Sequence, residues 1–232
     1  MIRTAVDGDG DVRVVTLDRP DSRNALTEAG LEDLRSTVET ATEPVVYLHG
    51  AGEAFCAGAD LETVAGLSGE DGAAFARHGQ AVATALADYD GAVVAGVDGA
   101  ARGGGLELAL ACDVRVATPD ATLAATGVTI GLLGAWGGTV RLPAVVGRGE
   151  AMDLALSGRP VGATEARRMG LVSRVVEDPR AVALEIAGND ADAVRAVAAR
   201  LRDDAPPERR GDREATAFAQ LVASADVENR NG

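Results

Sequence analysis

The residues best suited to chemistry in this sequence are Glu107 and Gly104, three positions apart in the segment ARGGGLELAL at 101–110. In a helix, positions i and i+3 share a face, so the Glu107 carboxylate and the Gly104 N–H can face one small volume. The first N–H groups of a helix lack internal acceptors and favour an anionic oxygen, which glycine allows to approach. This pairing predicts an acid/base site. The alternative is that the glycines only permit close packing and that Glu107 is an ordinary first-turn acid.

A second loop of small residues, at 54–60, follows a predicted buried strand. The N–H of Ala59 in this loop and that of Gly104 could lie on either side of one carbonyl oxygen and stabilise an enolate. The alternative is an ordinary tight loop in which Asp60 caps a helix that begins near Leu61.

The elements that must position these residues alternate along the chain, which predicts an α/β fold. Apolar runs predict strands at 12–17, 45–49, 92–97, 114–117 and 173–176. Helices are predicted at 27–40, 69–88, 104–111, 148–157, 179–203 and 212–225, with a flexible link at 203–211.

These motifs resemble those of the crotonase superfamily, also called the enoyl-CoA hydratase/isomerase family, over about three quarters of the chain. The resemblance is carried by Val14 and TLDRP at 16–20, by NAL at 24–26, by the 55–60 loop, by VDG at 97–99 followed by Glu107, by ACD at 111–113, by Gly131, by GGT at 137–139, by Arg141-Leu142 and by GLV at 170–172.

The resemblance implies a spiral of ββα units over residues 1–178 and a helical C-terminal region over 179–232, assembled as a trimer or a pair of trimers. It implies that the N–H groups of Ala59 and Gly104 form an oxyanion hole for the thioester carbonyl of a coenzyme A substrate, with no tightly bound cofactor. Glu107 corresponds to the first of two acid/base glutamates in family hydratases. Residues implied to line the coenzyme A site, mostly through main-chain atoms, are Asn24, Ala25, Leu26, Ala57, Asp60 and Leu61.

The sequence departs from the family pattern at the second glutamate, because Gly127 stands at the corresponding position. Glycine can neither position nor deprotonate water. The hydroxyls of Thr126 and Thr129 could hold a water there, or both could be ordinary loop residues. No acid replaces the lost group nearby in sequence, because Asp120 is predicted to lie in a turn after Pro119.

One carboxylate leaves several reactions open. Hydration by Glu107 alone would be slower, whereas double-bond isomerisation needs only one group that moves a proton between carbons. Decarboxylation needs only the oxyanion hole. We therefore expect an enoyl-CoA hydratase or isomerase; the alternatives are an acyl-CoA decarboxylase or an acyl-CoA binding protein with little turnover.

Charge and composition restrict the class of protein. The chain has 232 residues, 47% of them hydrophobic, which is enough for one sizeable core. Its 36 acidic and 22 basic residues give a net charge of −14, and every basic residue is an arginine. This balance argues against nucleic-acid binding and indicates adaptation to high salt, to which a GC-rich genome is the alternative or an added cause.

The cysteines and histidines favour structural roles. Cys56 and Cys112 have no CxxC or paired-histidine context, so neither a disulfide nor a metal site is expected. His49 and His78 are expected to be structural or solvated. Neither a signal peptide nor a membrane span is evident, and we expect a soluble cytoplasmic protein.

Two features near the predicted site need a structure to interpret. The single tryptophan, Trp136, lies where relatives commonly carry a small residue near the acyl chain, so it either narrows the pocket or simply fills the core. After the segment 218–226 the chain ends at Gly232, whereas many relatives continue into one more helix that helps cover the coenzyme A site.

Overall fold

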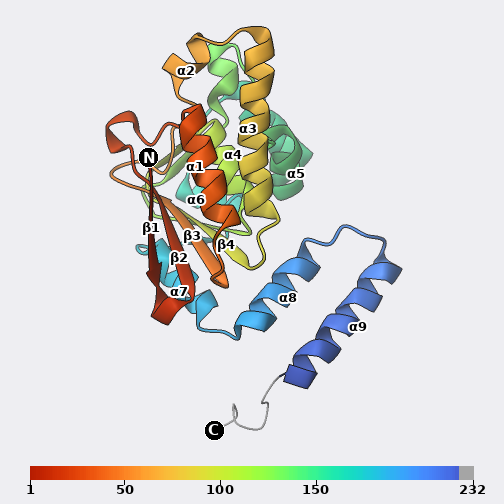
Figure 1. The fold of residues 1–232 in the computed structure, drawn as a ribbon. Helices are drawn as coiled ribbons and strands as arrows, with labels where there is room; N and C mark the ends of the chain where they lie inside the picture. Colours follow the sequence, from red (N-terminus) through yellow and green to blue (C-terminus); the bar gives the residue numbers. More distant parts are fainter. Residues whose placement is uncertain (225–232) are drawn as a thin grey trace.

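The computed structural model describes residues 1–224, and its centre is a six-stranded sheet with the order β1-β2-β3-β4-β6-β9 (Figure 1). Its strands are β1 (Ile2–Asp7), β2 (Val12–Leu17), β3 (Val45–Gly50), β4 (Ala92–Val97), β6 (Val114–Ala117) and β9 (Arg174–Val175). β1 is antiparallel to β2, and every other pair in this sheet is parallel. A second sheet, β5-β7-β8, contains β5 (Ala100–Arg102), β7 (Thr122–Ala124) and β8 (Val161–Gly162).

Helices cover both faces of the large sheet. They are α1 (Glu28–Glu39), α2 (Leu61–Ala65), α3 (Gly69–Ala87), α4 (Gly104–Ala111), α5 (Gly138–Ser157), α6 (Ala163–Arg168), α7 (Pro179–Ala187), α8 (Ala191–Leu201) and α9 (Pro207–Ser224), with short 3₁₀ turns at Gly8–Gly10, Pro20–Ser22 and Thr126–Ile130. α1 and α3 lie on one face, and α7 packs against β2, β3, β4 and β6 on the other (Figure 1).

The central strands supply apolar side chains to both faces, as expected of parallel strands buried between helices. In β3, for example, Val46 and Leu48 belong to the core beneath α1 and α3, whereas Val45 and Tyr47 belong to the core beneath α7. The large sheet is therefore a rigid support for the loops that leave the ends of β3 and β4.

Most predicted elements are confirmed, and three are corrected. α5 begins at Gly138, ten residues before the predicted start, and its axis breaks at Gly147, where φ is +79°. The predicted helix at 179–203 is two helices, α7 and α8, because Asp190 starts α8 as an N-cap that accepts from Ala193 N. The predicted flexible link at 203–211 is helical from Pro207 onward. Ala225 and the rest of the C-terminal segment lie outside the described residues.

α8 and α9 form a hairpin that projects from the body of the protein (Figure 1). α9 has no buried residue, and its Phe218 side chain is 69% exposed. Within residues 1–224, no helix combines the length and the apolar character needed to cross a bilayer.

Candidate active site

α4 begins at Gly104, just after β5. β5 leads into α4 through Gly103, whose φ of +48° turns the chain sharply into the helix. The first main-chain hydrogen bond of the helix runs from Glu107 N to Gly103 O at 3.1 Å. Among the described residues, no acceptor is recorded for the N–H of Gly104, so this donor is available to a ligand.

The second loop lies directly against the first. Gly58 has a φ of +91°, and a Cβ on it would lie 2.7 Å from the amide nitrogen of Gly104. Leu26 N donates to Gly58 O and Asp60 N donates to Leu26 O, so the intervening Ala59 N–H points away from this pairing. In the described part of the chain the Ala59 N–H also has no acceptor. Two unpaired main-chain donors therefore come from adjoining loops.

Glu107 is buried, with 5% of its surface exposed, three residues after Gly104. Its Oε1 accepts hydrogen bonds from Trp136 N at 2.9 Å and Gly138 N at 2.6 Å. Burial raises the pKa of the carboxyl group, and the N–H groups of Gly138 and Trp136 and the charge of Arg141 offset part of that rise. The Ala135 N–H adds a smaller contribution that lowers the pKa, and no hydrogen bond to Oε2 is present among the described residues. Glu107 thus has one fixed oxygen and one oxygen free to exchange a proton.

The sequence did not predict that segment 134–138 holds the Glu107 carboxylate. A Cβ at Gly134 would lie 2.9 Å from Glu107 Oε1, and a Cβ at Gly138 would lie 2.7 Å from it, so a side chain at either position would displace the Glu107 carboxylate. Gln80 supports this segment from α3, with Nε2 donating to Ala135 O at 2.9 Å. The repeated glycines of 134–138 were the sequence signal for this close approach.

Trp136 packs between α3 and the start of α4. Its side chain is 3% exposed, and its ring centroid lies 6.0 Å from that of Phe75 at an angle of 58°. Part of the ring occupies the space that a side chain on Gly104 would need, with Cη2 2.9 Å from that Cβ position. Trp136 is therefore both a core residue and a direct neighbour of the Gly104 donor.

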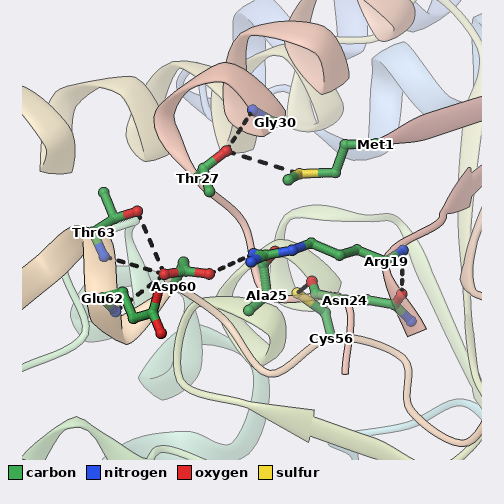
Figure 2. A network of polar contacts seen from close by, with 10 residues as sticks. All are labelled: Met1, Arg19, Asn24, Ala25, Thr27, Gly30, Cys56, Asp60, Glu62 and Thr63. Carbon is green, nitrogen blue, oxygen red and sulfur yellow. Dashed lines mark hydrogen bonds and ion pairs between the residues drawn. The ribbon is translucent and has the colours of Figure 1, made fainter. Parts of the chain in front are cut away.

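The residues expected to line a coenzyme A site adjoin this region, but two of their side chains are engaged internally (Figure 2). Asn24 is 1% exposed; its Nδ2 donates to Ala51 O at 2.9 Å and Ala54 O at 2.7 Å, and its Oδ1 accepts from Arg19 N at 2.9 Å. Its side chain ties segment 19–24 to segment 51–54 and is not available to a ligand.

Asp60 caps α2, as the alternative interpretation predicted. Its Oδ1 accepts from Glu62 N at 3.0 Å and Thr63 N at 3.1 Å, and its Oδ2 pairs with Arg19 (Figure 2). The Arg19 hydrogen bond, with the N–H of Thr63, lowers the pKa of Asp60 and keeps it charged. Among the other expected lining residues, Ala25 and Leu26 are buried, Ala57 is half-buried and Leu61 is 61% exposed.

Gly127, which the family resemblance aligns with the second glutamate, has little free space around it. Gly127 lies in the 3₁₀ turn Thr126–Ile130, and a Cβ there would lie 3.1 Å from the carbonyl carbon of Leu133. Thr129 Oγ1 donates to Thr126 O at 2.8 Å, so the Thr129 hydroxyl proton is already used. Asp120 is exposed in the turn between β6 and β7, as predicted.

The cysteines and histidines have structural contacts. Cys56 and Cys112 are free, buried thiols, and burial raises the pKa of each to about 12. Cys56 Sγ donates to Asn24 O at 3.1 Å and stabilises the second loop. His49 bonds to Thr16 Oγ1 at 2.9 Å, and exposed His78 pairs with Glu28 at 3.0 Å. Residues 1–224 contain no cluster of His, Cys, Asp and Glu placed to bind a metal ion.

Comparison with known proteins gives a consistent result. Residues 7–229 match the family described as enoyl-CoA hydratase/isomerase. The chain is 38% identical to the short-chain-enoyl-CoA hydratase of Clostridium acetobutylicum over 73% of this chain and 67% of that protein. It is 35% identical to the human mitochondrial enoyl-CoA hydratase domain-containing protein 2 over 75% of this chain and 62% of that protein.

Solved structures agree with the sequence comparisons. The enoyl-CoA hydratase of Bacillus anthracis superposes with a TM-score of 0.89 at 33% identity, covering 97% of this chain and 92% of that one. A protein from Thermobifida fusca YX solved in complex with CoA superposes with a TM-score of 0.86 at 29% identity, covering 96% of this chain and 93% of that one. With its predicted α/β fold confirmed and its family motifs in order, this chain belongs to the enoyl-CoA hydratase/isomerase family, the crotonase superfamily.

Proposed function

We propose that this protein is an enoyl-CoA hydratase or isomerase that works through an enolate and a single acid/base residue, Glu107. The proposal rests mainly on the environment of this buried carboxylate. Its Oε1 is held by two main-chain N–H groups, and its Oε2 has no hydrogen-bond donor among the described residues. Glu107 follows the unpaired N–H of Gly104 by three residues. Burial raises the pKa of this carboxyl, which makes its ionised form a stronger proton acceptor than an exposed glutamate.

In the proposed mechanism, the thioester carbonyl oxygen accepts hydrogen bonds from the N–H groups of Ala59 and Gly104. Both donors belong to main chain held by the sheet, so they need not reorganise as negative charge develops on the oxygen. The free Oε2 of Glu107 transfers the proton at a carbon next to the activated carbonyl. The fixed Oε1 keeps the carboxylate in the orientation that this transfer requires.

Gly127 favours isomerisation over hydration as the main activity. Arg141 is the charged side chain that shifts the pKa of Glu107, and no acidic side chain contributes to the shift. Moving a double bond requires one group that takes a proton from one carbon and returns it to another. Hydration is faster when a second acid positions the water, and Gly127 has no side chain to do this.

The proposed substrate is an acyl- or enoyl-CoA, so coenzyme A enters as part of the substrate and not as a tightly bound cofactor. The bridge between Leu26 and Ala59 places segments 24–26 and 57–61 side by side. We propose that their main-chain atoms, with Ala25, Ala57 and exposed Leu61, contact coenzyme A. The side chains of Asn24 and Asp60 shape that surface through their internal hydrogen bonds.

For the assembly, we propose a homotrimer or a pair of trimers in a salt-rich cytoplasm. Support for association comes from α9, which within residues 1–224 packs mainly on α8 and exposes Phe218 and Val222. Two buried free thiols fit a reducing compartment, and a net charge of −14 fits high salt. Light scattering in molar KCl tests the assembly, and a monomer would contradict it.

The decisive assay compares crotonyl-CoA, a 3-enoyl-CoA and methylmalonyl-CoA in molar KCl. We expect turnover of an enoyl-CoA and a loss of about 10²–10⁴-fold in Glu107→Gln. The matched control is Glu43→Gln, another buried acid that bonds Arg13 far from the site and should keep its turnover. Unchanged turnover in Glu107→Gln, or turnover of methylmalonyl-CoA alone, would contradict the proposal.

A crystal structure with a bound acyl-CoA tests the two donors separately. The thioester oxygen should lie about 2.7–3.1 Å from both amide nitrogens, Ala59 and Gly104. An oxygen beyond hydrogen-bond distance of either nitrogen would remove that part of the mechanism.

A further inference from the structure

The indole of Trp136 fills one specific space between α3 and α4. A Cβ on Gly79 of α3 would collide with the five-membered ring at Cδ1, Nε1 and Cγ. A Cβ on Gly104 of α4 would collide with the six-membered ring at Cζ3 and Cε3. The ring therefore spans the gap between the two helices, and both helices carry glycine where it touches them.

This arrangement differs from ordinary core packing. A core usually closes by interlocking side chains of intermediate size, and an alanine at Gly79 or Gly104 would suit a helix better by about 1 kcal/mol each. Here two glycines leave an open slot, and one large ring occupies it. The far side of the ring faces Phe75, one helical turn before Gly79, so the slot is closed on the α3 side by two aromatic rings.

The slot adjoins the reacting atoms. Gly104 supplies one of the two unpaired donors, and the ring lies on the Cα of that same residue. The main-chain N–H of Trp136 holds Glu107 Oε1 at 2.9 Å. The side chain of Trp136 thus lies between Gly104, which supplies the proposed carbonyl-binding N–H, and α3. The main chain of Trp136 also holds the carboxylate of Glu107.

We propose that Trp136 is the residue that limits the acyl chain, so that the enzyme accepts short acyl- or enoyl-CoA thioesters and excludes long ones. This inference rests on the proposed function of the site. The indole contacts the same residue whose N–H would bind the carbonyl oxygen, so the acyl carbons next to that carbonyl would lie within about one residue's width of the ring. Further methylene groups directed toward α3 meet the ring and Phe75, whereas a smaller residue at 136 would open the slot to them.

The test measures chain-length selectivity in wild type, Trp136→Phe and Trp136→Ala. All three keep the main-chain N–H that holds Glu107. We expect wild type to prefer a four-carbon over a ten-carbon enoyl-CoA by about 100-fold in kcat/KM, since single methylenes change selectivity by about 10–200-fold. Trp136→Ala should reduce that ratio at least tenfold, and Trp136→Phe should give an intermediate value.

The control separates selectivity from stability. Leu154→Ala in α5 removes another fully buried side chain of the same core, so it should lower the melting temperature without changing the chain-length ratio. If Trp136→Ala behaves like Leu154→Ala, Trp136 only fills the core and the inference is wrong. A wild-type enzyme that accepts ten carbons as readily as four also overturns it.

Measurements of binding test this inference separately from the proposed function. Calorimetric Kd values for butanoyl-CoA and decanoyl-CoA, measured on the same variants, need no turnover. If no thioester reacts, the proposed function fails while the Kd ratio still decides the role of Trp136. A Kd ratio that favours four carbons in wild type and narrows in Trp136→Ala supports the inference, and an unchanged ratio refutes it.

Discussion

The raised pKa of Glu107 fixes the direction of the pH dependence. A base must be ionised to accept a proton, and burial raises the pKa of this carboxyl above its ordinary value of 4.5. We expect kcat/KM to fall as the pH is lowered through that raised pKa, about tenfold per pH unit below it. The fall should begin at a higher pH than an exposed glutamate would give. A profile that stays flat down to the ordinary value would contradict the assignment of Glu107 as the base.

Asp98, just after β4, is a half-buried acid with one buried carboxylate oxygen. Among the described residues its Oδ1 is a buried side-chain oxygen without a hydrogen-bond partner, and burial raises its pKa to about 6. Because the folded-state pKa lies above the unfolded value, this cost is absent below about pH 4 and fully present above about pH 6. Ionised Asp98 therefore destabilises the fold by about 2–3 kcal/mol at neutral pH.

We expect Asp98→Asn to raise the free energy of unfolding by about 1–2 kcal/mol at pH 7.5 and to change it little at pH 4. Urea denaturation at both pH values measures this difference. The matched control is Asp120→Asn, an exposed turn aspartate that should have no effect at either pH. A gain that is equal at pH 4 and 7.5 would show that the charge of Asp98 is not its cause. Asp98→Asn should also leave the Glu107 pH profile in place.

The start of the 54–60 loop depends on Asn24, whose side chain bonds three main-chain groups, Arg19 N, Ala51 O and Ala54 O. Asn24→Ala would leave these buried groups unpaired, so we expect a loss of about 2–4 kcal/mol in the free energy of unfolding. Asn189→Ala is the control, because its Nδ2 also donates to two carbonyls, but at an exposed helix end. It should cost less than about 1 kcal/mol. Equal effects in denaturant unfolding would contradict a special role for Asn24.

Local sequence predicted the elements better than it predicted the contacts between them. The bounds of β2, β4, β6 and α4 were predicted to the residue. Apolar runs mark the three strands, and glycines mark the start of α4. The Asp60 cap was also predictable, because its acceptors lie two and three residues away. Each of these signals is contained in one short segment of the chain.

The parts that were missed depend on distant residues. The N–H donors that hold Glu107 come from Trp136 and Gly138, 29 and 31 residues further along the chain. Asn24 was assigned to coenzyme A by resemblance, whereas its hydrogen bonds reach residues 27 and 30 positions away. The start of α5 was missed because glycines 137 and 138 oppose a helix by propensity, and the contact with Glu107 accounts for glycine at 138.

The net charge of −14 predicts a stability that depends on salt. Self-repulsion of the folded chain weakens as ions screen it, so we expect the melting temperature to be higher in 2 M KCl than in about 0.1 M KCl. Neutralising three exposed acids, Asp9, Asp33 and Glu150, to their amides should raise the melting temperature in low salt and reduce its salt dependence. If the triple variant keeps the full salt dependence, the effect of salt does not come from charge repulsion.

The sequence contains no lysine, and both thiols are buried with a pKa of about 12. Thioesters modify proteins by transferring their acyl group to a free amine or a thiolate, and a permanently protonated guanidinium accepts none. The side chains of this protein therefore offer an activated acyl donor neither an amine nor an exposed thiolate. A protein that handles such a donor throughout its working life is protected from slow self-acylation by its composition and by the burial of its sulfur atoms.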